Sequence, residues 1–214
     1  MSAPTLTPEL RALLRRVKLG RCLDTLPERL ALAQTGGMGH AEFLELVLAD
    51  EVTRRETTSA DRRARAAGLD PDMTLDRWDD DAKVTYDRAI WNELCSLRFI
   101  ESGHNAVIMG PVGVGKTFLA TALGHAATRR RYSVHFERCD RLVKRLRASR
   151  LDNSHDVEMR RLLRVDLLII DDFGMKQLPK RSGECLFEVI MRRYETRSTV
   201  MTSNRPLEDW GKLI

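Results

Sequence analysis

The feature that most constrains how this chain folds is a glycine-rich segment of eight residues in its second half. Positions 110–117 read GPVGVGKT and fit the pattern G-x-x-x-x-G-K-[ST] at every fixed position. The segment lies between a short apolar run, 106–109, and a helical stretch that begins near Lys116. Glycines at this spacing permit positive φ angles, so successive backbone N–H groups can turn inward around a phosphate. The pattern therefore predicts a phosphate-binding loop between a buried strand and a helix, with a chance glycine-rich turn as the alternative.

The chemistry of such a loop assigns roles to two of its side chains. Lys116 is placed to reach the β- and γ-phosphates of a nucleoside triphosphate, and the Thr117 hydroxyl is placed to bind Mg²⁺. The N-terminus of the following helix presents its positive end to the same anion. The candidate nucleotide-binding residues are Gly110, Pro111, Val112, Gly113, Val114, Gly115, Lys116, Thr117 and Phe118.

A pair of carboxylates follows a second apolar run. Residues 167–170 read LLII, as a buried strand would, and precede Asp171 and Asp172. Parallel strands bind ligands beyond their carboxyl ends, so both side chains are expected beside the loop. Asp171 is predicted to bind the magnesium ion through its hydration shell, and Asp172 to polarise the attacking water. The alternative is that the two aspartates only cap the next turn.

A third apolar run, 199–202, leads to a candidate catalytic amide at Asn204. An amide at that strand tip can hydrogen-bond the γ-phosphate or the attacking water. An asparagine before Arg-Pro is also ordinary turn chemistry, which is the alternative interpretation. The predicted catalytic set is therefore Lys116, Asp171, Asp172 and Asn204.

The hydrophobic periodicity changes near residue 100. In residues 1–100, apolar side chains recur at helical spacing, and no alternation typical of a strand occurs. In residues 101–214, four short apolar runs alternate with helical stretches at 116–131, 139–150 and 183–196. This order predicts an α/β fold whose parallel sheet is covered by helices on both faces. We therefore expect an all-helical N-terminal domain, 1–100, before an α/β domain, 101–214.

The formal charge of +5 is concentrated in the predicted α/β domain. Residues 1–100 carry 15 basic and 17 acidic side chains, whereas residues 101–214 carry 21 and 14. The four cysteines are widely spaced without a C-x-x-C pair, which favours free thiols in a reducing compartment. No apolar run approaches the roughly 20 residues of a membrane span, and the N-terminus lacks the pattern of a signal peptide. These features favour a cytoplasmic protein without a membrane partner.

The order of the loop, the Asp-Asp strand and the Asn-tipped strand resembles that of the AAA+ ATPases. More closely, the chain resembles the IstB-like helper proteins of insertion-sequence transposition and their relative, the helicase loader DnaC. The matching stretches are 110–123, 164–174 (RVDLLIIDDFG) and 193–210 (RYETRSTVMTSNRPLEDW) in the second half, and 43–45, Glu51, 55–56, 62–65 and 74–78 in the first. Agreement in both halves favours the transposition helper, and the helicase loader is the alternative.

The resemblance implies a P-loop AAA+ core that hydrolyses ATP with Mg²⁺. It also implies a homo-oligomer that assembles on double-stranded DNA and activates a partner transposase. Many AAA+ proteins have Asp-Glu where this chain has Asp171-Asp172, and the shorter side chain predicts slow hydrolysis. The chain stops at Ile214, before the segment where relatives carry the arginine finger and second sensor, so we expect a truncated core. A nucleotide- and DNA-binding module without efficient hydrolysis is a further alternative, whereas a small-molecule kinase has no support in the sequence.

Two groups of basic residues are candidate DNA contacts for an ATPase of this kind. In the predicted helix 139–150, basic side chains fall opposite an apolar stripe formed by Leu142, Val143 and Leu146. No aromatic residue interleaves with either group, so contacts to phosphates are expected to be independent of DNA sequence. The alternative is a solvated helix face. The candidate DNA-binding residues are Arg62, Arg63, Arg65, Arg141, Lys144, Arg145 and Arg147.

Overall fold

The computed structural model describes residues 6–79, 84–175 and 180–212. The chain divides into two compact units, residues 1–59 and residues 60–214. The sequence prediction divided the chain at 100/101 instead. The difference arises because Leu69, Phe99 and Ile100 belong to the same buried cluster as Leu123 and Ile169 of the second unit. Helical periodicity identifies an apolar face, but it does not say which core that face joins.

The described part of the first unit consists of helices joined by short turns. Its elements are α1 (Pro8–Arg16), a 3₁₀ turn (Gly20–Asp24), α2 (Leu26–Gly36) and the first part of α3 (His40–Ala66). Thr7 caps α1 by accepting a hydrogen bond from the Leu10 N–H at 3.2 Å, and Gly37 ends α2 with a left-handed φ of 61°. A small core forms from Leu6, Cys22, Leu26 and Val47.

The second unit is built on a four-stranded parallel sheet in the order β1-β4-β3-β2. The strands are β1 (Ala106–Met109), β2 (Val134–Arg138), β3 (Leu167–Phe173) and β4 (Ser198–Ser203). The helices are α4 (Arg88–Ser96), α5 (Arg98–Glu101), α6 (Lys116–Arg129), α7 (Cys139–Leu151), α8 (His155–Arg164) and α9 (Lys180–Arg193), with 3₁₀ turns at Leu75–Arg77 and Leu207–Lys212.

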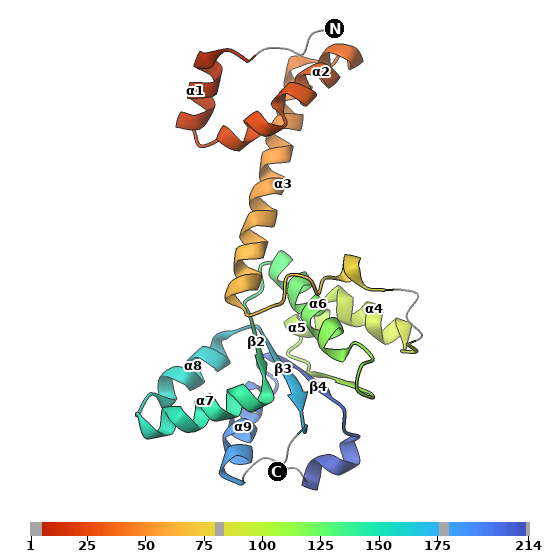
Figure 1. Cartoon of the computed structure of the whole chain (residues 1–214), viewed down its shortest axis with the longest axis vertical. Helices are drawn as coiled ribbons and strands as arrows, with labels where there is room; N and C mark the ends of the chain where they lie inside the picture. The colour runs from red at the N-terminus through yellow and green to blue at the C-terminus, as the bar shows by residue number, and fades with distance from the viewer. Residues whose placement is uncertain (1–5, 80–83, 176–179, 213–214) are drawn as a thin grey trace. The chain divides into compact units, whose positions relative to one another are not determined.

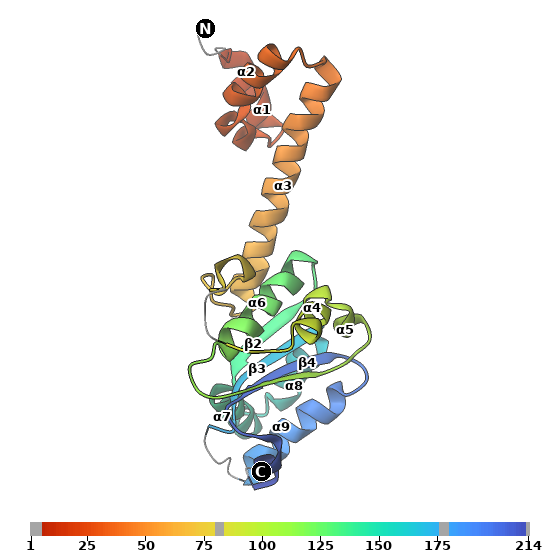
Figure 2. The same cartoon turned by 90° about the vertical axis from the view of Figure 1, so that its right-hand side faces the viewer.

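Helices cover both faces of this sheet (Figures 1 and 2). Successive residues of β3 point to opposite faces, so Leu167 and Ile169 pack with α6 and the α4–α5 segment. Leu168 and Ile170 pack with α7, α8 and α9 on the other face. The predicted parallel sheet with helices on both faces is therefore confirmed, as is the helical N-terminal region.

A buried arginine at the end of α9 connects the segment between α8 and β3 with the start of β4. Arg193, at the end of α9, is fully buried and donates five hydrogen bonds to neighbouring oxygen atoms. The acceptors are the carbonyls of Leu162 (2.5 Å), Val165 (2.9 Å), Asp166 (3.4 Å) and Ser198 (2.5 Å), and Oγ1 of Thr199 (3.1 Å). Burial and the charge of Arg197 lower the pKa of Arg193 to about 10. The guanidinium thus ties the α8–β3 connection to the start of β4.

None of the described helices combines the length and the apolar character that a bilayer span requires.

Candidate nucleotide-binding site

The glycine-rich loop connects β1 directly to α6. Gly113 and Gly115 have φ angles of 88° and 87°, the left-handed region that other residues rarely adopt. A Cβ added at Gly113 would meet open space, so glycine is required there for its conformation alone. A Cβ at Gly115 would lie 2.8 Å from the ring of Trp78, so that glycine also makes room for packing. The loop therefore has the shape that the sequence pattern predicts.

The side chain of Lys116 folds back over this loop. It is nearly buried at the first turn of α6, and its Nζ donates a hydrogen bond to the Pro111 carbonyl at 2.6 Å. The Gly110 N–H donates to the Ser203 carbonyl at 3.2 Å, which extends the pairing of β1 with β4 into the loop. Lys116 thus places a cation beside backbone N–H groups that an anion can accept from.

The loop meets the acidic strand through one hydroxyl. Thr117 Oγ1 donates to the carboxylate of Asp171, at 2.9 Å from Oδ1 and 3.1 Å from Oδ2, and Asp171 is 2% exposed. The two residues lie 54 positions apart in the chain, and the sheet topology brings them together. A hydroxyl and a carboxylate are the oxygen ligands that Mg²⁺ prefers, so this pair fits a magnesium ion bound with the phosphates of a nucleotide.

Asp172 lies beside a basic residue that the sequence did not single out. Its Oδ2 is 3.2 Å from Nη2 of Arg138, at the end of β2. Burial and the neighbouring charge of Asp171 raise the pKa of Asp172, while Arg138 and Lys116 act in the opposite direction. The position of Arg138 at the carboxyl end of a strand was the available signal, because neighbouring parallel strands end at one edge of the sheet.

Asn204 follows β4 and is exposed, and no hydrogen bond joins it to Asp171 or Asp172. The residue that contacts both aspartates is instead Thr202, two positions earlier. Sequence reasoning missed Thr202 because a threonine inside an apolar run is typical of any buried strand.

An aromatic group packs against the same loop. The ring of Phe118 lies 5.3 Å from that of Trp78, and Trp78 contacts Tyr86, which in turn contacts Trp91. Val114 lies close to Gly110 across the loop, whereas Val112 at its tip is 78% exposed.

The predicted basic groups have different surroundings in the structure. Arg141, Lys144 and Arg147 are exposed on α7. Arg145 is half-buried and forms ion pairs with Glu137 and Glu158, so its charge is neutralised within the unit.

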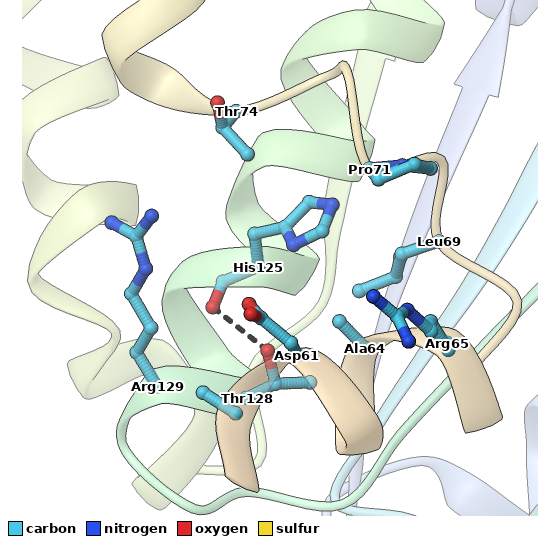
Figure 3. Close-up of a pocket in the computed structure, with 10 residues that line it drawn as sticks. Asp61, Ala64, Arg65, Leu69, Pro71, Thr74, His125, Thr128 and Arg129 are labelled. Atoms are coloured by element: carbon cyan, nitrogen blue, oxygen red, sulfur yellow. Dashed lines mark hydrogen bonds between the residues drawn. The ribbon is translucent and has the colours of Figure 1, made fainter. Parts of the chain in front are cut away.

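In the second group, Arg63 donates through Nε and Nη2 to the Thr128 carbonyl at 3.0 and 2.8 Å, and so caps the end of α6. Arg62 and Arg65 of α3 are exposed. Arg65 also lines a cavity of about 200 Å³ at the C-terminal end of α6, with Leu69, His125 and Arg129 (Figure 3). Because the glycine-rich loop meets the other end of α6, this cavity is separate from the nucleotide-binding site.

Comparison with known proteins identifies related sequences along most of the chain. Residues 12–214 match the family described as IstB-like ATP binding protein. A putative ATP-binding protein of an insertion sequence from Mycobacterium tuberculosis is 37% identical over 97% of this chain and 83% of its own length. The putative ATP-binding protein of insertion sequence IS21 from Pseudomonas aeruginosa is 32% identical over 96% of this chain and 78% of its own length.

Solved structures share the fold of about two thirds of this chain. AMPPCP-bound DnaA from Aquifex aeolicus aligns with a TM-score of 0.55 and 25% identity, over 64% of this chain and 43% of that chain. DnaI aligns with a TM-score of 0.55 and 21% identity, over 66% of this chain and 77% of that chain. The alignment with DnaA therefore spans less than half of the DnaA structure, whereas the alignment with DnaI spans about three quarters of that chain.

Proposed function

Because the chain belongs to the family of IstB-like ATP-binding proteins, we propose that it is a DNA-binding ATPase that assists insertion-sequence transposition. Its second unit has the P-loop AAA+ fold that the sequence predicted, which it shares with DnaA and DnaI. In this proposal the protein assembles on target DNA with ATP and activates a partner transposase.

The observation that carries the ATPase proposal is the contact between Thr117 and Asp171. Lys116 and the backbone N–H groups of the loop hold the β- and γ-phosphates, while Thr117 and Asp171 hold Mg²⁺. A magnesium ion bound by these residues would supply positive charge to stabilise the negative charge that develops on the phosphates. The carboxylate of Asp172 lies at the same sheet edge and would polarise the attacking water by accepting its proton. Asn204, exposed at the end of β4, completes the proposed catalytic set by hydrogen bonding to the γ-phosphate or the attacking water.

The proposed DNA-binding surface consists of Arg141, Lys144 and Arg147 of α7, with Arg62 and Arg65 of α3 as a second contact. All five side chains are exposed, and no ion pair with a described acidic residue neutralises them. Arginine and lysine side chains of this kind bind phosphates and release counterions, so the binding depends on salt and not on sequence. The insertion-sequence context of the relatives supports DNA and a transposase as partners.

The first unit is the proposed site of self-assembly or transposase contact. Leu44, Leu48 and Val52 recur at spacings of four along α3, and each is more than 40% exposed. A stripe of large apolar side chains on one helix face is typical of a surface that another protein covers.

The DNA-binding proposal is tested with the triple variant Arg141→Ala/Lys144→Ala/Arg147→Ala. We expect ATP to strengthen the binding of wild-type protein to a fluorescent 30-base-pair duplex, measured by anisotropy between 50 and 200 mM salt. The triple variant should bind more weakly, and the slope of log K against log salt should become shallower by about 3, because three phosphate contacts are lost.

The matched control removes three arginines that are already paired with acidic residues. Arg98→Ala/Arg192→Ala/Arg197→Ala causes the same loss of charge, since these residues face Glu93, Glu188 and Asp166. The salt slope of this control should remain close to that of wild type. The proposal fails when ATP leaves both DNA affinity and oligomeric state unchanged, as sedimentation velocity would show.

Replacing Arg138 should change the pH dependence of hydrolysis. Arg138 lowers the pKa of Asp172, so Arg138→Ala should raise that pKa further. A general base acts only when deprotonated, and the acid limb of the pH–rate profile should therefore move to higher pH. The measurement is steady-state ATP hydrolysis from pH 5 to 9, with Asp172→Asn as the control that slows turnover at every pH. A profile of Arg138→Ala that coincides with that of wild type would contradict the role of Asp172 as base.

A further inference from the structure

The two aspartates of β3 are held by one buried hydroxyl on the neighbouring strand β4. Thr202 is fully buried, and its Oγ1 donates to Oδ1 of Asp171 at 2.6 Å. The same oxygen accepts a hydrogen bond from the backbone N–H of Asp172 at 2.9 Å. One side chain therefore contacts the carboxylate of the first aspartate and the backbone of the second.

This contact lies at an irregularity in the sheet. Ile170 pairs with Met201 and Phe173 pairs with Ser203, so two residues of β3 lie opposite the single residue Thr202 of β4. This arrangement is a β-bulge, which bends a strand and redirects its side chains. Within the bulge, Asp172 has a φ of 59°, the left-handed region that aspartate tolerates better than most residues.

The bulge decides where both carboxylates lie. In a regular strand, successive side chains point to opposite faces of the sheet. Here Asp171 reaches Thr117 of the loop, and Asp172 reaches Arg138 at the end of β2. Both contacts lie at the carboxyl edge of the sheet, beside the proposed phosphate site.

We propose that Thr202 is a positioning residue that locks this bulge and thereby orients Asp171 for magnesium and Asp172 for the attacking water. The inference rests on the proposed function, because it concerns the same site with ATP and Mg²⁺. Thr202 donates a hydrogen bond to one carboxylate oxygen of Asp171, and this bond restricts rotation of the carboxylate. By accepting this hydrogen bond, Thr202 also stabilises the left-handed backbone conformation of Asp172.

The test compares Thr202→Val, which keeps the shape and removes the hydroxyl, with Thr202→Ser, which keeps the hydroxyl. ATP affinity is measured by isothermal titration calorimetry with Mg²⁺ and with EDTA, and hydrolysis in steady state. Thr202→Val should lower the gain in ATP affinity that Mg²⁺ provides by about tenfold, and turnover by about 10²-fold or more. ATP affinity in EDTA should change by less than about twofold, and Thr202→Ser should restore the magnesium effect.

Thr121→Val is the matched control. The Thr121 hydroxyl is also buried in the second unit, and it has no hydrogen-bond partner among the described residues. This variant should bind Mg²⁺ and ATP like wild type. A Thr202→Val protein that is folded by circular dichroism and retains wild-type magnesium dependence and turnover would overturn the proposal.

A second measurement needs no variant. The N–H of Asp172 donates to a buried oxygen, so its exchange with deuterium in the wild-type protein should be slow. Exchange as fast as in an exposed loop would overturn the proposed lock even if Thr202→Val does not fold. If the wild-type protein shows no magnesium-dependent ATP binding, the proposed function is refuted. If wild type and Thr202→Val both bind and hydrolyse ATP equally well, only the role of Thr202 is refuted.

Discussion

Lys116→Ala is expected to lower ATP turnover by about 10²–10³-fold, because it removes the cation that faces the charge developing on the transferred phosphate. The side chain is nearly buried and lies over the loop, where water screens its charge poorly. The variant loses the hydrogen bond from Lys116 to the Pro111 carbonyl, while the pairing of the Gly110 N–H with the Ser203 carbonyl remains. Multiple-turnover hydrolysis with and without DNA, together with ATP titrations, measures the effect.

Arg160→Ala is the control for this prediction. It also removes one cation from the second unit, on the exposed surface of α8. ATP turnover should stay within about twofold of wild type, because exposed charges at a distance are screened. Wild-type turnover by Lys116→Ala would refute the site. Wild-type protein that binds ATP without turnover would favour the alternative of a binding module.

Arg193→Met should destabilise the second unit by about 3 kcal/mol or more, because it leaves several buried carbonyls without a donor. The acceptors include the carbonyls of Leu162 and Ser198, each 2.5 Å from the guanidinium. For a folded unit as long as residues 60–214, a loss of about 3 kcal/mol corresponds to a fall in Tm of roughly 6–12 °C. All three tryptophans, Trp78, Trp91 and Trp210, lie in the second unit. Their fluorescence during urea denaturation therefore reports on that unit.

The neighbouring residue supplies the control for Arg193→Met. Arg192 is about half exposed and forms an ion pair with Glu188 one turn away. Its replacement by alanine should change the free energy of unfolding by less than about 1 kcal/mol. Equal stability of Arg193→Met and Arg192→Ala would show that the buried hydrogen bonds do not stabilise the fold.

The parts of the fold predicted correctly are those governed by local chemistry. The run LLII at 167–170 is apolar at every position, as a strand buried on both faces requires, and it lies in β3. The glycine pattern at 113 and 115 is required by backbone angles, and both residues have positive φ. Helix α8 was not predicted, because its arginines and acidic residues obscure the short apolar stripe of Met159 and Leu162.

The candidate site could be predicted only in part. Thr117 and Asp171 were assigned to one magnesium site from the motif, and they are in hydrogen-bond contact. The signal for Arg138 and Thr202 was only their position near the end of a strand, and an arginine or a threonine occurs there in many proteins. Arg145 was indistinguishable from Lys144 in the sequence, yet it forms two ion pairs inside the unit.

The phosphate-binding loop was therefore recognisable from residues adjacent in the chain, since the spacing of Gly113, Gly115, Lys116 and Thr117 is a local pattern. The position of the two carboxylates depends on the pairing of β3 with β4, where Thr202 lies opposite both aspartates. The association of residues 60–100 with the second unit depends in the same way on which apolar surfaces meet. Strand register and core partners are set by contacts between distant segments, and these contacts exist only in the folded chain.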